Sequence, residues 1–285
     1  MSHNAIEWAT IGQYMAEVVV IKFGGGLITN KSQMCTPEID IIDDLVDVVA
    51  NCLQQELRVI VVHGAGSFGH LRAKHWRLNE GLISNHDFYP QDDCESQMQA
   101  VSIVRKEMLT LNSIIKKSFA KKGISTISHP PHKWARNTGS NFSGNIKNRF
   151  DSSKEVAITF GDVVDCDVGE FGILSGDDLV VRICQEVPNV SRLIFAVKGV
   201  DGILRRPPEV ATADDLIKKW SPNVEFSGVH HSDIDVTGGI GLKASRGAEV
   251  ASMGIDVFII NGEKSQRLLD ACTGVPTIGT QIFSN

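Results

Sequence analysis

Residues 18–31 read VVVIKFGGGLITNK, a mostly β-branched apolar run with one lysine that ends in three consecutive glycines. A short run of this kind is typical of a strand buried on both faces of a parallel sheet. The pattern returns at residues 58–70, RVIVVHGAGSFGH, where a second apolar run ends in a second glycine loop. Because ligands in open α/β sheets bind at the carboxyl ends of the strands, the two loops predict a shared site there.

The rest of the chain alternates apolar runs of strand length with longer segments of helical periodicity. Strands are expected over Val18–Phe23, Arg58–Val62, Ser125–Ser128, Val156–Phe160, Leu193–Val197, Val257–Ile260 and Thr277–Ile282. Helices are expected over Pro37–Gln54, Cys94–Lys122, Asp177–Gln185, Gly239–Met253 and Lys264–Cys272. Pro130–Asp151 is expected to be a flexible loop or an irregular hairpin, and Val168–Ile173 to contain a turn with Gly169 and Gly172. The alternation predicts an α/β fold, a mostly parallel open sheet with helices on both faces.

No linker divides the chain. We expect residues 1–17 to form an N-terminal extension and residues 18–285 to form a single domain. Within that domain, an N-terminal lobe is expected at about residues 18–165 and a C-terminal lobe at about residues 166–285.

Composition excludes several classes of function. With 28 Lys and Arg against 34 Asp and Glu, the net charge is −6, so no broad basic surface is available for nucleic acid or an acidic membrane. No apolar run approaches the roughly 18 residues that cross a bilayer, and the first residues lack a secretory signal pattern. The six cysteines lie far apart without a CxxC pair, which is typical of reduced thiols in a cytoplasmic protein.

Two familiar nucleotide motifs match only in part. Residues 64–69, GAGSFG, fit the dinucleotide-binding pattern, but no strand ending in an acid follows about 20 residues later. Residues 25–32, GGLITNKS, fit a P-loop except that Asn30 replaces the glycine before the lysine. The next strand also ends in His63, where a P-loop protein needs a magnesium-binding Asp. Both interpretations are therefore disfavoured.

The two glycine loops are instead flanked by basic side chains, Lys22 and Lys31 around the first and His70 after the second. Backbone N–H groups in glycine-rich turns form anion-binding nests, so this combination favours phosphate binding over glycines that serve only tight turns. Residues 237–243, TGGIGLK, add a lysine near a helix start, and residues 175–178, SGDD, add acids at another. Plain N-capping is the alternative for the last motif.

In this order the motifs resemble the amino acid kinase family, and within it the isopentenyl phosphate kinases. The segments that carry the resemblance are VIKFGGGLITNK (20–31), VVHGAGSFGH (61–70), FGDVV (160–164), GILSGDD (172–178), VDGIL (200–204), DVTGGIGLK (235–243), INGE (260–263) and IGTQI (278–282). They span nearly the whole chain after residue 17. The box that ends in His70 marks the isopentenyl phosphate kinases and their fosfomycin-kinase relatives.

The resemblance implies roles for particular residues. The catalytic residues it implies are Lys22, Lys31, His70, Asp177 and Lys243. The ATP-binding residues it implies are Lys22, Gly24, Gly25, Gly26, Gly66, Asp201, Gly239 and Lys243. The acceptor-binding residues it implies are Ala65, Gly66, Gly69, His70 and Gly161, which makes the N-terminal lobe the acceptor side and the C-terminal lobe the nucleotide side. This chain departs from the family at Gly26, often a serine, at Ala65 within a usual glycine triplet, and at residues 198–202, which lack the usual Thr-Asp.

The activity implied is ATP- and Mg²⁺-dependent phosphorylation of isopentenyl phosphate to isopentenyl diphosphate, by a homodimer in a mevalonate-type isoprenoid route. A fosfomycin-type phosphonate or another small phosphomonoester is the alternative acceptor, and a nucleotide-binding or storage protein is the non-enzyme alternative. Walls for the acceptor tail are expected around Met98, Val101, Ile103 and Val104, with a stripe of core residues as the alternative for each of them.

The remaining histidines are not assigned to the site. His63 is expected to be structural. The pairs His129/His132 and His230/His231 are expected to be solvated loop residues without metal-ligand spacing.

Overall fold

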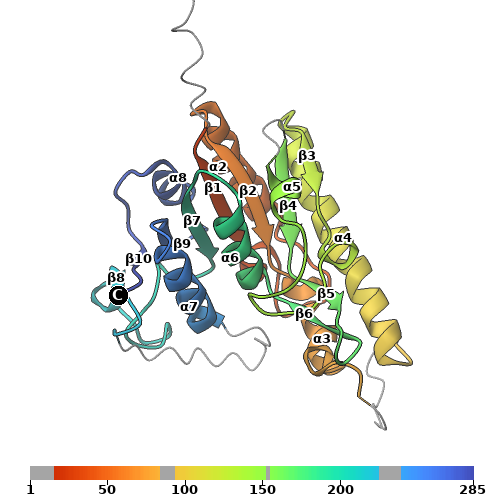
Figure 1. The fold of residues 1–285 in the computed structure, drawn as a ribbon. Helices are drawn as coiled ribbons and strands as arrows, with labels where there is room; N and C mark the ends of the chain where they lie inside the picture. The colour runs from red at the N-terminus through yellow and green to blue at the C-terminus, as the bar shows by residue number, and fades with distance from the viewer. Residues whose placement is uncertain (1–15, 84–93, 152–154, 225–238) are drawn as a thin grey trace, which may run out of the picture.

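A computed structural model describes residues 16–83, 94–151, 155–224 and 239–285. An eight-stranded sheet crosses it in the order β3-β4-β2-β1-β7-β9-β10-β8 (Figure 1). The strands are β1 (Val18–Phe23), β2 (Arg58–His63), β3 (Thr126–Ser128), β4 (Val156–Phe160), β7 (Val190–Val197), β8 (Lys219–Trp220), β9 (Asp256–Asn261) and β10 (Thr280–Ile282). The strands from β3 through β9 in this order are parallel, and β10 pairs antiparallel with β9 and parallel with β8.

Helices cover both faces of this sheet. They are α1 (Gly25–Ile28), α2 (Ile39–Gln54), α3 (His70–His75), α4 (Gln97–Lys121), α5 (Lys147–Phe150), α6 (Gly176–Glu186), α7 (Gly239–Ala251) and α8 (Ser265–Thr273). The expected α/β fold, a mostly parallel sheet between two helical layers, is confirmed.

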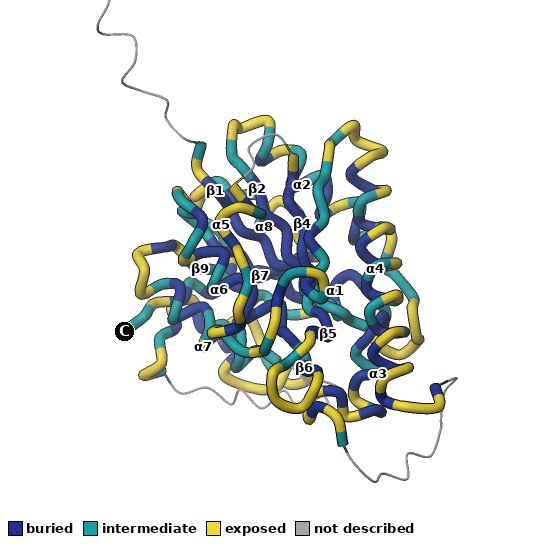
Figure 2. Tube along the Cα trace, turned by 45° about the vertical axis from the view of Figure 1, so that its right-hand side comes forward, coloured by how far each residue is buried: buried dark blue, intermediate teal, exposed yellow. Residues whose placement is uncertain are grey.

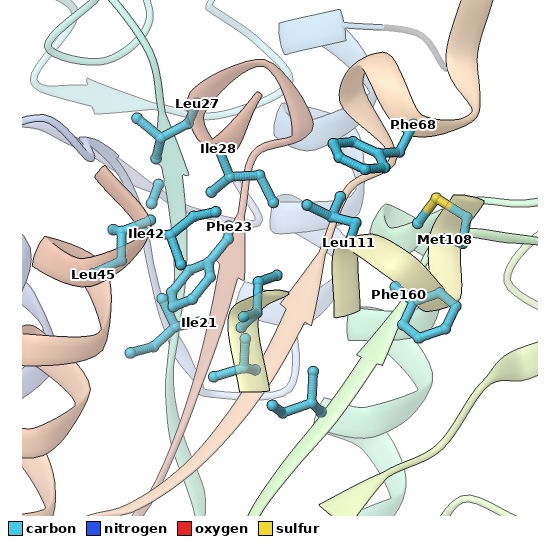
Figure 3. Packing of buried hydrophobic residues seen from close by; sticks show 14 of the residues in the cluster. Ile21, Phe23, Leu27, Ile28, Ile42, Leu45, Phe68, Met108, Leu111 and Phe160 are labelled. Carbon is cyan, nitrogen blue, oxygen red and sulfur yellow. The ribbon is translucent and has the colours of Figure 1, made fainter. Parts of the chain in front are cut away.

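The side chains of β1 alternate between two separate cores. Val19, Ile21 and Phe23 pack with residues of α2, α4 and α8 in the first core, which Figure 3 shows from close by. Val18 and Val20 pack with residues of α6 and α7 in the second core. Figure 2 shows the resulting buried centre, with exposed segments gathered at the periphery. Because successive side chains of a strand point to opposite faces, the next residue in the second series is Lys22, which therefore faces α6 and α7.

Two helices begin at side-chain caps. The Ser175 hydroxyl accepts the Asp177 N–H at 3.0 Å where α6 begins, and the Ser96 hydroxyl accepts the Gln99 N–H at 3.2 Å where α4 begins. Such caps satisfy N–H groups that a helix leaves without an internal partner. At the other end, α8 stops at Gly274, whose φ of 78° suits glycine. The expected helix over Cys94–Lys122 thus begins three residues later than predicted.

The sequence did not predict the short helices α1, α3 and α5, the edge strand β8 or the β5–β6 hairpin, which is formed by β5 (Asp162–Asp165) and β6 (Phe171–Leu174). The prediction of a turn at Gly172 was wrong, because Gly172 lies inside a strand of this antiparallel hairpin, whose turn contains Gly169. The interpretation of Pro130–Asp151 as an irregular hairpin is confirmed, since Arg136 and Ser143 exchange two backbone hydrogen bonds of 2.9 and 2.8 Å.

Within the described ranges, none of the helices combines the length and apolar character needed to cross a bilayer. All six cysteines fall in these ranges and have free thiols.

Candidate active site

The glycine loops meet at one edge of the sheet because the parallel strands before them all end there. A cavity of about 690 Å³ opens between these loops, α3, α4 and the starts of α6 and α7. The residues with predicted site roles that line it are Lys22, Gly24, Gly25, Gly26, Lys31, Ala65, Gly66, Gly69, His70, Gly161, Gly239 and Lys243. The structure therefore brings most of the predicted site together. Thr237 and Gly238 of the last glycine motif lie outside the described residues.

The two glycine loops contact each other backbone to backbone. A Cβ atom at Gly25 would lie 2.4 Å from the amide nitrogen of Gly66, so no side chain fits there. Gly66 has a φ of +51°, a left-handed conformation that favours glycine. The loop after β1 and the loop after β2 therefore form one surface with exposed backbone groups, suited to close approach by an anion.

A buried ion-pair cluster forms one wall of this cavity. Lys22, which faces the second core, forms a salt bridge with Asp177 in the first turn of α6. Lys243 on α7 places its Nζ 3.5 Å from the other carboxylate oxygen of Asp177. Burial alone would raise the pKa of Asp177, but Lys22 and Lys243 hold it below its usual value, so the carboxylate stays charged. One acid thus positions two lysines in the wall of the cavity.

A neighbouring ion pair fixes the helix that carries Lys243. Asp178, next to Asp177 on α6, is paired with Arg246 of α7 at 2.8 Å. Arg246 lies one turn after Lys243, so this contact holds the start of α7 against the start of α6. The two adjacent acids of the SGDD motif therefore have separate partners and separate structural effects.

Lys31 lies across the backbone of Gly26. A Cβ atom at Gly26 would come within 2.2 Å of the Lys31 Cε, so the missing side chain at position 26 leaves room for the lysine. The family often has serine at position 26, and the glycine of this chain therefore leaves the space that Lys31 occupies. His70, the first residue of α3, lines the same cavity on the side of the second glycine loop.

Apolar side chains of α3, α4 and the β5–β6 hairpin also line the cavity. They include Ala73, Val104, Met108, Val163, Ile173 and Leu174. Of the four residues expected as tail-pocket walls, only Val104 lines the cavity. Met98 is 53% exposed, and Val101 and Ile103 pack with the first core. Met108 was missed, although it lies one helical turn after Val104 on the same face of α4.

Asp201 does not lie in this wall. Its carboxylate accepts a hydrogen bond from the Asn261 amide at 3.1 Å and pairs with Arg267 at 2.8 Å, which ties the loop after β7 to β9 and α8. The prediction that Asp201 contacts the nucleotide therefore stays a prediction, without support from the shape of the cavity.

Two of the histidine interpretations were wrong. His129 is buried, and His132 Nδ1 lies 2.6 Å from the carboxylate of Asp162, a cavity-lining residue. No local sequence pattern indicates the contact between His132 and Asp162, because the two residues are 30 positions apart. The structural role of His63 is confirmed: the ring is fully buried and stacks on Phe160, and burial lowers its pKa to about 4. His230 and His231 lie outside the described residues.

Comparison with known proteins agrees with this arrangement. The sequence profile of the amino acid kinase family matches residues 17–261. The chain belongs to the amino acid kinase family. The isopentenyl phosphate kinase of Thermoplasma acidophilum is 29% identical over 255 residues, which cover 89% of this chain and 95% of that protein. The isopentenyl phosphate kinase of Arabidopsis thaliana is 27% identical over 257 residues, which cover 80% of this chain and 71% of that protein.

Solved structures share the fold of this amino acid kinase family member. X-ray structures of isopentenyl phosphate kinase include a chain that superposes with a TM-score of 0.75 at 22% identity, covering 93% of this chain and all of the other. Among the described residues, no group of three or more His, Cys, Asp or Glu side chains is arranged to hold a metal ion. The carboxylate of Asp162, which lines the cavity, contacts His132, and the carboxylate of Asp177 is paired with Lys22 and Lys243.

Proposed function

We propose that this protein catalyses ATP-dependent phosphorylation of isopentenyl phosphate to isopentenyl diphosphate. One observation carries the proposal: a single cavity is lined by the two lysines that pair with Asp177, by His70 and by apolar side chains of α3, α4 and the β5–β6 hairpin. Lysines suit the phosphates of a nucleotide, and an apolar compartment suits a short hydrocarbon tail. The similarity to isopentenyl phosphate kinases supports the same assignment.

The chemistry demands little covalent help from the protein. Transfer of a γ-phosphoryl group to another phosphate brings many anionic oxygens together, so positioning and charge neutralisation dominate catalysis. We assign Lys22 and Lys243 to the phosphates of the nucleotide and Lys31 to the phosphoryl group in transfer. Asp177 holds the first two lysines in place without taking part in the bond changes.

His70 is assigned to the acceptor phosphate as a hydrogen-bond donor. A phosphate monoester is already anionic near neutral pH, so its attacking oxygen needs no strong general base. Gly66 and Gly69 of the adjoining glycine loop and Gly161, which line the same cavity, are assigned to the same phosphate.

Magnesium fits this site as a partner of the nucleotide. Mg²⁺ in kinases is held largely by substrate phosphates and water. Asp177 is paired with two lysines and the carboxylate of Asp162 contacts His132, so neither acid is available for a protein cage, and we assign the ion to the nucleotide phosphates. When bound it supplies positive charge between the phosphates in addition to that of the lysines. A homodimer and a cytoplasmic location remain predictions.

The test is ADP release from ATP with a panel of acceptors at equal concentration: isopentenyl phosphate, dimethylallyl phosphate, phosphorylated C10 and C15 alcohols, and fosfomycin. We expect isopentenyl phosphate to give the highest kcat/KM and dimethylallyl phosphate to be used as well. Faster turnover of fosfomycin would reject the acceptor. Nucleotide binding without turnover of any acceptor would favour the non-enzyme alternative.

Matched lysine variants connect this activity to the cavity. Lys243→Ala should lower kcat/KM. The loss of transition-state stabilisation should be about 2–4 kcal/mol, the range for loss of one preorganised electrostatic group. Lys218→Ala, at an exposed lysine outside the cavity, is the control and should keep the activity of the unchanged protein. Equal activity in both variants would contradict the assignment of Lys243.

A further inference from the structure

The hydroxyl group of Thr29 lies between the two glycine loops. Thr29 is fully buried, and its Oγ1 donates a hydrogen bond to the carbonyl oxygen of Gly25 at 2.8 Å. The same oxygen accepts the N–H of Ser67 at 2.9 Å. Gly25 belongs to the loop after β1 and Ser67 to the loop after β2, so one hydroxyl group joins both loops through their backbones.

Ser67 makes three further hydrogen bonds with the segment that follows Thr29, one of which its hydroxyl group donates to the Thr36 carbonyl oxygen at 3.4 Å. Its carbonyl oxygen accepts the Cys35 N–H at 3.0 Å, and its hydroxyl oxygen accepts the Thr36 N–H at 3.2 Å. Lys31 lies inside the segment that these contacts hold at both ends, from Thr29 to Thr36. The buried Ser67 therefore anchors the lysine-bearing segment to the loop that leads into His70.

The junction is closely packed where the Thr29 hydroxyl group meets the second loop. A Cβ atom at Gly66 would lie 2.0 Å from the Thr29 Oγ1. On the other side of Ser67, the ring of Phe68 is buried in the first core, in the same cluster as Ile28 and Leu111 (Figure 3). Close-packed interiors transmit small displacements because they leave no voids to absorb them. A change at this contact therefore moves the loops relative to each other.

We propose that Thr29 and Ser67 are positioning residues that set the distance between the nucleotide phosphates and the acceptor phosphate. The inference rests on the proposed function, in which the first loop holds the nucleotide and the second loop holds the acceptor. If the contact between Thr29 and Ser67 is lost, each loop keeps its own phosphate contacts. The reacting oxygen and phosphorus atoms are then no longer aligned. Transfer rates are sensitive to such alignment, and a misplacement of about 1 Å can cost about 100-fold.

The experiment compares steady-state kinetics and melting temperature of Thr29→Val, Thr29→Ser and Ser67→Ala with those of the unchanged protein. Valine keeps the shape of threonine but removes the hydroxyl group, whereas serine keeps the hydroxyl group. Thr280→Val is the matched control, because Thr280 is also fully buried and its Oγ1 accepts the Ile203 N–H at 2.8 Å and donates to the Ile217 carbonyl at 2.6 Å. It joins two segments away from the glycine loops.

We expect Thr29→Val to lower kcat by roughly 10- to 100-fold while the KM values for ATP and the acceptor change by less than about threefold. Thr29→Ser should keep most of the kcat of the unchanged protein. Ser67→Ala should lower kcat, as Thr29→Val does. Thr280→Val should lower the melting temperature as Thr29→Val does but leave kcat near that of the unchanged protein.

Three outcomes would overturn the inference: a normal kcat in Thr29→Val, equal kcat losses in Thr29→Val and Thr280→Val, or a rise in KM alone. If Thr29→Val does not fold, Ser67→Ala and Thr29→Ser decide the question by the same kcat criterion. Failure of the proposed function is distinguishable, because the unchanged protein would then not phosphorylate isopentenyl phosphate at all.

Discussion

Asp177→Asn removes the one negative charge that lies between Lys22 and Lys243. The side chains of Asp177 and Lys22 are only 1% and 6% exposed, so water cannot replace the lost partner. Neutralising one member of a buried pair costs about 3–5 kcal/mol, because the other charge stays buried without compensation. At about 2–4 °C per kcal/mol, the melting temperature should fall by about 6–20 °C.

Nucleotide should reverse part of this loss. In the variant, the phosphates of ADP replace the carboxylate as the negative partner of both lysines. The phosphates are also no longer repelled by the carboxylate, because asparagine is uncharged. Saturating ADP should therefore raise the melting temperature of the variant by more than that of the unchanged protein. ADP release with isopentenyl phosphate should fall at least 100-fold, because the lysines are no longer held in place.

The matched control is Asp165→Asn. Asp165 also pairs with a basic residue, Arg105 at 2.7 Å, but its side chain is 58% exposed. Exposed pairs contribute at most about 1 kcal/mol, so this variant should melt close to the unchanged protein. Equal melting temperatures for the two variants, or normal activity in Asp177→Asn, would refute the role given to the buried carboxylate.

Three further predictions concern single residues. His70→Ala should abolish most turnover and His70→Gln should keep part of it, because an amide N–H still donates a hydrogen bond; equal, near-complete loss in both folded variants would favour a general base instead. Gly66→Ala should melt at a lower temperature than Gly123→Ala, since both residues have a positive φ but only Gly66 has neighbours in the space of a Cβ; equal melting temperatures would contradict this. His63 binds a proton near pH 6.5 in the unfolded chain and near pH 4 in the folded protein, so the free energy of unfolding should fall by about 3 kcal/mol as the pH drops through this window. Urea denaturation at both ends of the window should show a smaller fall in His63→Gln, and an equal fall would reject the assignment to His63.

Much of the fold is predictable because its strands are continuous apolar runs and its helices have clear periodicity. β1 and β2 could be identified from residues 18–31 and 58–70 alone, since burial on both faces leaves polar residues only at Lys22 of β1 and at the two ends of β2, Arg58 and His63. The β5–β6 hairpin was missed because its strands are four residues each and Gly169 and Gly172 both suggest a turn. Short strands pair through tertiary contacts that no local pattern records.

The candidate site was also predictable only in part. Lys22, Lys31 and the glycines were found because they lie beside the loops that end the strands. Met108 and the pairing of His132 with Asp162 were not found, since each depends on which helix face or loop approaches the cavity. Thr29 belongs to the quoted motif, yet its contact with Ser67 joins positions 38 residues apart. Sequence motifs identified the groups that bear charge, while the contacts that orient them needed the structure.

The central place of β1 also has a consequence during synthesis of the chain. One edge of β1 pairs with β2, which the ribosome makes soon after it, but the other edge pairs with β7, whose residues are 190–197. Until those residues leave the exit tunnel, an apolar strand presents a row of unpaired N–H and C=O groups to its surroundings. We therefore expect nascent chains halted before residue 190 to bind chaperones and aggregate more readily than chains halted after residue 197. A strand that is fully buried in the finished protein is thus exposed while the protein is being made.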